Sequence, residues 1–144
     1  EKTIWPGRLE IIRESGRAKI ILDGAHNPAS ARILTETIRD FFPQTDVTVI
    51  IGLSDDKDRK GILKELGLIA KKIVFTKARH PRAWSFQMQE IEECRLTASC
   101  FLSENVQAAM AIARRETGLE GLILICGSLF VVAEAREICI KSKA

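Results

Sequence analysis

The chain has 144 residues, of which 46% are hydrophobic and 28% are charged, a size and composition typical of one globular domain with a single core. Its 22 basic and 19 acidic residues leave a net charge of +3, which is too balanced to indicate nucleic-acid binding. Neither a run of about 18 apolar residues nor a signal-peptide pattern occurs. We therefore expect a cytoplasmic protein with no nucleic-acid or membrane partner.

Two further features of the sequence bear on its class. The chain does not begin with Met and opens on a charged and then aromatic segment, residues 1–5, so we expect it to be part of a longer protein. Its four cysteines, at 94, 100, 126 and 139, form no C-x-x-C pair. Buried, reduced thiols are therefore favoured over disulfides or a zinc site.

The first elements in chain order form a predicted hairpin. Residues 8–12 alternate weakly in polarity, residues 14–16 (ESG) form a turn, and residues 18–22 end in the aliphatic run Ile20-Ile21-Leu22. Such a run is typical of a strand buried on both faces. The short spacing predicts that the first strand is antiparallel to the second.

The rest of the chain alternates between helical and strand patterns. Asn27 and Pro28 predict a helix start, and Ala31, Leu34, Ile38 and Phe41 recur at helical spacing up to Pro43, which ends the helix. Further strands are predicted at 47–51, 72–76, 97–102 and 122–126. Further helices are predicted at 58–70, with Ile62, Leu63, Leu66 and Ile69 inward, from a cap at Ser85 to Cys94, from a cap at Ser103 to before Gly118, and from Gly127-Ser128 to about 140.

This alternation predicts a parallel sheet joined by right-handed crossovers. We expect an α/β fold: a Rossmann-like three-layer domain whose mostly parallel sheet has about six strands, one of them an antiparallel N-terminal strand. Residues 1–144 form a single domain in this interpretation.

The segment KIILDGAHNP, residues 19–28, places polar residues between a core strand and a helix. Ligands of open α/β sheets bind at this position, and we expect the helix end to offer free N–H groups to an anion. Asp23 fits a contact to ribose hydroxyls or, alternatively, a charge that stabilises the helix dipole. His26 fits an exposed ligand contact or a structural role, and no further residues at metal-ligand spacing accompany it.

Other charged residues follow other strands. Arg8 lies across the predicted hairpin from Asp23, as a site residue or an ordinary surface arginine. Residues 55–58 (DDKD) indicate a solvated turn with a helix cap, whereas Lys77, Arg79, His80 and Arg82 fit an anionic ligand. Gly127-Ser128 at a helix start is another possible anion contact.

The phosphate-binding and catalytic motifs of several large classes are absent. The sequence contains no G-x-x-x-x-G-K-[ST], G-x-G-x-x-G, G-x-S-x-G or H-E-x-x-H, the signatures of P-loops, dinucleotide sites, hydrolase elbows and zinc proteases. The chain can help to bind a nucleotide, but it does not itself supply the phosphate cradle.

Five segments together resemble the C-terminal domain of folylpolyglutamate synthase and of its bifunctional dihydrofolate synthase relatives, in the Mur ligase superfamily. They occur in order over nearly the whole chain: residues 5–10 (WPGRLE), 22–28 (LDGAHNP), 52–58 (GLSDDKD), 81–83 (PRA) and 126–130 (CGSLF). The pairing of PGR-L-E with DGAHNP is specific to this group within the superfamily.

The resemblance implies an ATP-dependent amide ligase in which this domain is the C-terminal part. An N-terminal P-loop domain, absent here, would hold Mg²⁺ and a carbamylated lysine and convert a carboxylate of folate or dihydropteroate into an acyl phosphate. The amino group of L-glutamate then attacks. The C-terminal domain closes over ATP and excludes water from the intermediate, and we expect a monomer.

The resemblance also implies roles for individual residues. Arg8 and Asp23 match ATP contacts, with Asp23 suited to the ribose, and His26 matches a catalytic histidine near the phosphates. Ser128 and Arg82 lie in matching segments and are assigned to the glutamate site. Two alternatives are a Mur-type ligase of cell-wall synthesis, which the PGR and DGAHNP pair disfavours, and a free-standing nucleotide-binding or interaction module, which the absent P-loop favours.

Overall fold

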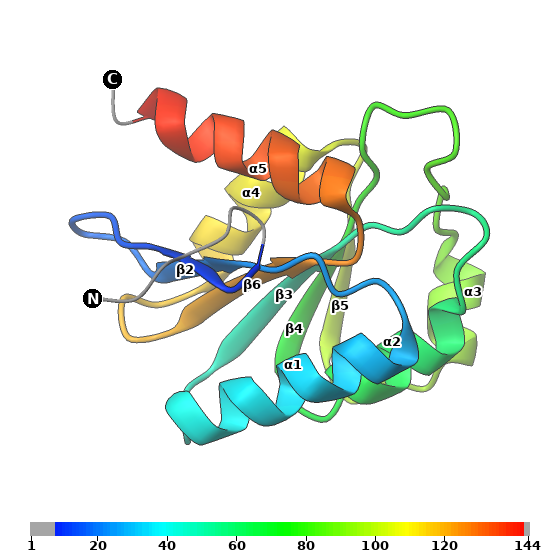
Figure 1. Cartoon of the computed structure of the whole chain (residues 1–144), viewed down its shortest axis with the longest axis horizontal. Helices are drawn as coiled ribbons and strands as arrows, with labels where there is room; N and C mark the ends of the chain where they lie inside the picture. The colour runs from blue at the N-terminus through cyan, green and yellow to red at the C-terminus, as the bar shows by residue number, and fades with distance from the viewer. Residues whose placement is uncertain (1–7, 143–144) are drawn as a thin grey trace.

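The computed structural model of the chain describes residues 8–142. They form a six-stranded sheet with helices packed on both of its faces (Figure 1). The elements in chain order are β1 (Glu10–Ile12), β2 (Lys19–Leu22), α1 (Pro28–Phe41), β3 (Val47–Ile51), α2 (Arg59–Leu66), β4 (Ala70–Phe75), α3 (Met88–Glu93), β5 (Ser99–Leu102), α4 (Val106–Glu116), β6 (Leu122–Cys126) and α5 (Leu129–Ser142). Residues 5–7 of the WPGRLE segment lie outside the described residues.

The strands are ordered β1-β2-β6-β3-β4-β5 across the sheet. Within residues 8–142, β1 pairs antiparallel with β2, and every other pair of neighbouring strands is parallel. Glu10 lies opposite Leu22 in the hairpin. The predicted α/β fold with one antiparallel N-terminal strand is therefore confirmed.

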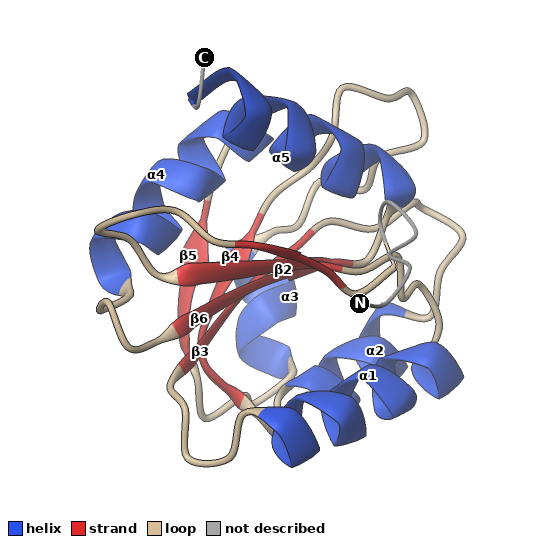
Figure 2. Ribbon diagram, turned by 60° about the vertical axis from the view of Figure 1, so that its left-hand side comes forward, coloured by secondary structure: helices blue, strands red, loops and turns tan. Residues whose placement is uncertain are grey.

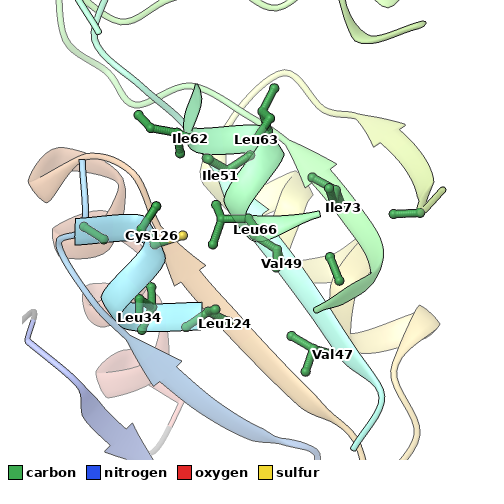
Figure 3. Packing of buried hydrophobic residues seen from close by; sticks show 14 of the residues in the cluster. Leu34, Val47, Val49, Ile51, Ile62, Leu63, Leu66, Ile73, Leu124 and Cys126 are labelled. Atoms are coloured by element: carbon green, nitrogen blue, oxygen red, sulfur yellow. The ribbon is translucent and has the colours of Figure 1, made fainter. Parts of the chain in front are cut away.

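The sheet separates two hydrophobic clusters. α1, α2 and α3 cover one face and α4 and α5 cover the other (Figure 2). Along β3 the side chains of Val49 and Ile51 pack against the first group of helices, and Ile50 packs against the second. Figure 3 shows the first cluster, in which Leu34 and Leu66 meet the strands. Each large aliphatic side chain buried in this way contributes about 1.5–3 kcal/mol.

One predicted helix end and one predicted core position differ from the structure. α2 ends at Leu66, with Gly67 as its C-cap, and Ala70 already begins β4, so the predicted helix 58–70 is too long by one turn. Leu68 is exposed and Ile69 only half-buried in the connecting turn. The predicted inward position of Phe41 is also wrong. This side chain is 72% exposed, and Phe42 packs against the core instead.

Neither predicted serine cap holds its helix. Ser85 accepts a hydrogen bond from Lys77 Nζ, and α3 begins after Gln87. Ser103 donates to the carbonyl oxygen of Phe75, and the side chain of Asn105 caps α4. In both cases the serine hydroxyl forms a hydrogen bond with a residue outside the helix, and the helix begins further along the chain.

None of the four cysteines, all of which lie within residues 8–142, forms a disulfide, as predicted from their spacing. Cys126 and Cys139 are buried, and burial raises the pKa of the Cys126 thiol well above its usual range. Cys94 and Cys100 are half-buried, and desolvation also raises their pKa values. Thiols with raised pKa values are poor nucleophiles, which agrees with a structural role.

The carboxyl ends of β3 and β6 approach each other through two glycines. Gly127 has a φ of +108°, and a Cβ at this position would overlap with the carbonyl oxygen of Gly52. A Cβ on Gly52 would in turn lie 2.6 Å from Cγ2 of Val131 and 3.0 Å from the carbonyl oxygen of Thr76. Glycine is therefore required at position 127 for the chain to leave β6 and enter α5, and the space around Gly52 leaves little room for a side chain.

We predict that Gly127→Ala destabilises the fold by about 2–3 kcal/mol or more, because it combines a left-handed backbone with a steric overlap. Gly118→Ala is the matched control, since Gly118 has no positive φ and no atom within 4 Å of an added Cβ. Urea unfolding of the two variants measures the difference. Equal stability would show that the contact between the two strand ends can relax at little cost.

Candidate functional site

The loops that follow β2, β3, β4 and β6 all open at the same edge of the sheet, because these four neighbouring strands run parallel. This carboxyl edge carries Asp23 and His26 after β2, residues 52–58 after β3, residues 76–87 after β4, and Ser128 after β6. Ligands of open α/β sheets bind at such an edge.

Asp23 links the end of β2 to the start of the hairpin. Its Oδ1 accepts a hydrogen bond from the Ala25 N–H at 2.9 Å, and its Oδ2 accepts one from the Leu9 N–H at 3.0 Å. Burial raises the pKa of Asp23, against the lowering effect of these two hydrogen bonds and of the Arg8 charge. A carboxylate has about four lone-pair sites, so each oxygen retains capacity for a further donor.

His26 is exposed, and its ring orientation is fixed by a backbone contact. Its Nδ1 lies 2.9 Å from the carbonyl oxygen of Gly24. Because a carbonyl only accepts, the hydrogen is assigned to Nδ1, which leaves a lone pair on Nε2 in the neutral ring. Nε2 of His26 therefore donates a hydrogen bond to an anion only when the ring is protonated.

The start of α1 offers fewer free N–H groups than expected, because several of them are already paired. Pro28 has no N–H, and the Ser30 N–H donates to the Asn27 side chain at 2.8 Å. The N–H groups of His26 and Asn27 both donate to Ser30 Oγ. This capping box satisfies these three donors, so they are not available to an anion.

Arg8, Asp23 and His26 line one open pocket of about 420 Å³. Its apolar wall includes Ile33 of α1 and Leu129 of α5, which are 64% and 63% exposed. The predicted hairpin does bring Arg8 to the same end of the sheet as Asp23. A pocket with an acceptor, two cationic or potentially cationic groups and an apolar wall fits a nucleotide, which has a ribose, phosphates and a base.

Ser128 and Arg82 do not line this pocket. Ser128 is buried at the start of α5, where its Oγ accepts a hydrogen bond from the Phe130 N–H at 3.1 Å. The exposed Arg82 guanidinium pairs with Asp55 Oδ1 at 3.3 Å and Asp56 Oδ2 at 3.1 Å. The hydrogen bond to Asp55 and the charge of Asp56 raise the pKa of Arg82.

A second histidine at this edge is His80, which the sequence indicates only as part of the basic loop 77–82. The His80 ring stacks on Phe130 with 3.9 Å between ring centroids, and its Nδ1 accepts the Arg82 N–H at 3.1 Å. Its neutral ring therefore has the proton on Nε2, the reverse of His26. No sequence signal pairs residues 80 and 130, which come from the loop after β4 and from the start of α5. By contrast, Ser30, Ile33 and Thr37 are three and four residues apart on α1 and therefore share one face of the helix, a spacing that could have indicated the pocket wall.

Residues 8–142 contain no group of three or more His, Cys, Asp or Glu side chains arranged to hold a metal ion. None of the helices in this range is long and apolar enough to cross a membrane.

The arrangement of sheet, helices and open carboxyl edge defines a Rossmann-like α/β domain. A family described as Mur ligase, glutamate ligase domain matches residues 7–129. The chain belongs to this family.

Individual members of the family to which the chain is similar are folylpolyglutamate and dihydrofolate synthases. The chain is 29% identical over 136 residues to the dihydrofolate synthase/folylpolyglutamate synthase of Bacillus subtilis, a match that covers 94% of this chain and 31% of that protein. The structure of E. coli FolC in complex with DHPP and ADP superposes with a TM-score of 0.85 at 28% identity, over 98% of this chain and 33% of that one. A bifunctional folylpolyglutamate synthase/dihydrofolate synthase with Mn, AMPPNP and L-glutamate bound gives a TM-score of 0.78 at 27% identity, over 94% and 32%.

The resemblance to folylpolyglutamate synthase is therefore confirmed by sequence and by structure. The chain spans about a third of the length of these relatives.

We predict that Asp23→Asn destabilises the domain by about 1–3 kcal/mol, because an amide accepts from only one of the Leu9 and Ala25 N–H groups and leaves the other buried and unpaired. Asp46→Asn is the control, since its side chain is 71% exposed and pairs with Lys71 at 3.5 Å; loss of such a pair costs little. Thermal unfolding of both variants measures the effect. A stable Asp23→Asn variant would mean that the carboxylate does not hold the hairpin.

Proposed function

We propose that this chain is the C-terminal domain of an ATP-dependent carboxylate–amine ligase that adds L-glutamate to folate, dihydropteroate or both through an acyl phosphate. The observation that carries the proposal is the pocket at the carboxyl edge, in which the DGAHNP segment and Arg8 meet, in a chain of the Mur ligase glutamate ligase family. Relatives named as folylpolyglutamate and dihydrofolate synthases support the substrate class.

The pocket residues fit the ATP side of this reaction. The free lone pairs of Asp23 accept hydrogen bonds from ribose hydroxyls, and the exposed Arg8 supplies a positive charge beside them. His26, as an imidazolium with Nδ1–H bonded to Gly24, directs its Nε2–H toward a phosphate oxygen. A donor at that position gains strength as charge develops in the transition state.

The divalent metal belongs on the other part of the enzyme in this proposal. Solved relatives contain Mn with AMPPNP, whereas residues 8–142 have no metal-binding group of side chains. We assign Mg²⁺, which supplies charge neutralisation at the phosphates, mainly to an N-terminal P-loop domain of the same protein.

Arg82 and Ser128 are assigned to the glutamate. The Arg82 guanidinium has five N–H donors and is 57% exposed, so its pairing with Asp55 and Asp56 leaves donors for a substrate carboxylate. Ser128 lies on the neighbouring loop, at the start of α5.

Closure of the two domains protects the acyl phosphate from water. Ile33 and Leu129 are large apolar side chains that remain well exposed beside the pocket, which supports a surface that another domain or a ligand covers. We also propose that the whole enzyme is monomeric and cytoplasmic.

We predict that the full-length protein forms ADP only when glutamate and a folate or dihydropteroate substrate are both present. The isolated chain should fold, because both hydrophobic clusters are complete within it, but should form no ADP. A coupled ADP assay with circular dichroism as the folding control tests both statements. Glutamate-dependent ADP formation by the isolated chain would contradict the division of labour, and turnover with a cell-wall precursor alone would replace the substrate class.

We predict that in the full-length enzyme His26→Ala lowers kcat on the order of 10²-fold, because it removes a donor that acts in the transition state. Asp23→Asn is the comparison and should mainly raise KM for ATP, since ribose binding is similar in ground and transition states. If both variants lose only thermal stability, the site assignment is wrong.

A further inference from the structure

The loops after β3 and β4 are joined to each other at the carboxyl edge. The Asp55 N–H donates to the carbonyl oxygen of Arg82, and the Trp84 N–H donates to that of Leu53, both at 2.8 Å. An antiparallel bridge lies between these two hydrogen bonds. Although the strands themselves are parallel, their loops therefore form one small antiparallel unit, and neither loop can shift alone.

A cluster of three side chains joins this unit to the helices α2 and α3. Arg59, the first residue of α2, stacks its guanidinium 3.7 Å from the Trp84 ring centroid. Arg59 Nε donates to Glu90 Oε2 at 2.7 Å, and Trp84 Nε1 donates to Glu90 Oε1 at 2.9 Å. Glu90 belongs to α3. Each partner thus comes from a different element, and each contacts the other two.

The chemistry of Glu90 shows that the cluster acts as a unit. Burial favours a raised pKa for Glu90, but the hydrogen bonds from Arg59 and Trp84 outweigh burial and lower that pKa. The side chains of Arg59 and Glu90 are 23% and 21% exposed. This cluster is consequently more shielded than the pair of Arg82 with Asp55, whose side chains are 57% and 50% exposed.

The residues of the cluster are close in sequence to the charged groups that the two loops present. Trp84 follows Arg82 by two residues, and Arg59 follows the acidic turn that carries Asp55 and Asp56. Those two aspartates hold the Arg82 guanidinium. The direction of Arg82 therefore depends on the relative position of the two loops, and the cluster joins the loop after β4, through Trp84, to Arg59 at the end of the loop after β3.

We propose that Arg59, Trp84 and Glu90 are positioning residues that hold the loops after β3 and β4 in the arrangement required for Arg82 to receive the carboxylate of the amino-acid substrate. The inference rests on the proposed ligase function. The three residues act through Arg82 and do not touch the substrate. They belong to none of the motif segments that carry the resemblance to folylpolyglutamate synthase.

The test uses steady-state kinetics of the full-length enzyme. Glu90→Gln places an amide between two donors, so that either Arg59 or Trp84 loses its acceptor. We expect KM for glutamate to rise on the order of tenfold, because a small displacement of a substrate-binding group has a large effect. KM for ATP should change by less than about twofold, since the pocket around Asp23 is formed by other elements.

Trp84→Phe is a second variant that keeps a ring under Arg59 but removes the Nε1–H. It should raise KM for glutamate in the same way, and the double variant should add little to either single change, as expected for residues that act as one unit. The matched control is Glu116→Gln. Its carboxylate pairs with Lys72 at 3.6 Å and is similarly shielded at 28% exposure, but Lys72 lies toward the amino end of β4.

The possible results distinguish a failure of the positioning role from a failure of the proposed ligase function. If the wild-type enzyme is active and Glu90→Gln and Trp84→Phe lower only Tm, or shift KM for glutamate no more than Glu116→Gln, the cluster is purely structural and the inference is wrong. An equal rise in KM for ATP also overturns it. If the wild-type enzyme shows no glutamate-dependent ADP formation, the proposed function and this inference fail together.

Discussion

The carboxyl edge exists because β2, β6, β3 and β4 are neighbouring parallel strands that are buried on both faces. Parallel strands end at the same edge, so the loops that follow them are brought together although they are far apart in the sequence. The packing of two hydrophobic clusters on opposite faces leaves that edge as the place where polar residues gather. The Cα of Gly127 lies close to the carbonyl oxygen of Gly52, so a side chain at position 127 would push the loops after β3 and β6 apart.

Two carboxylates organise this edge by accepting hydrogen bonds from two donors each. Asp23 joins the hairpin to the end of β2 through Leu9 and Ala25, and Glu90 joins α2 and the loop after β4 through Arg59 and Trp84. An amide cannot replace either carboxylate without leaving a donor unpaired. Asp23 thus combines its proposed contact to ATP with a structural role at the hairpin, which is a different role from the helix-dipole charge that the sequence suggested.

The two histidines of the chain present opposite chemistry at the same edge. Gly24 accepts from Nδ1 of His26, whereas Nδ1 of His80 accepts from the Arg82 N–H. In their neutral forms the outer nitrogen of His26 is an acceptor and that of His80 is a donor. The two side chains are identical, so the difference arises from their backbone partners, a carbonyl for His26 and an N–H for His80.

The sequence by itself determined the fold class, the hairpin, the core strands and the placement of Arg8, Asp23 and His26 in one region, because periodicity, turn residues and strand direction are local or follow from a few topological rules. It did not determine where Ser85 and Ser103 would donate or accept, which of Phe41 and Phe42 would face the core, or that Asp55 and Asp56 would hold Arg82. It also contained no signal for the contact of His80 with Phe130 or for the cluster of Arg59, Trp84 and Glu90. These features join residues that are distant in the chain, and only tertiary packing decides which hydrogen-bonding groups find a partner there and which remain for a ligand.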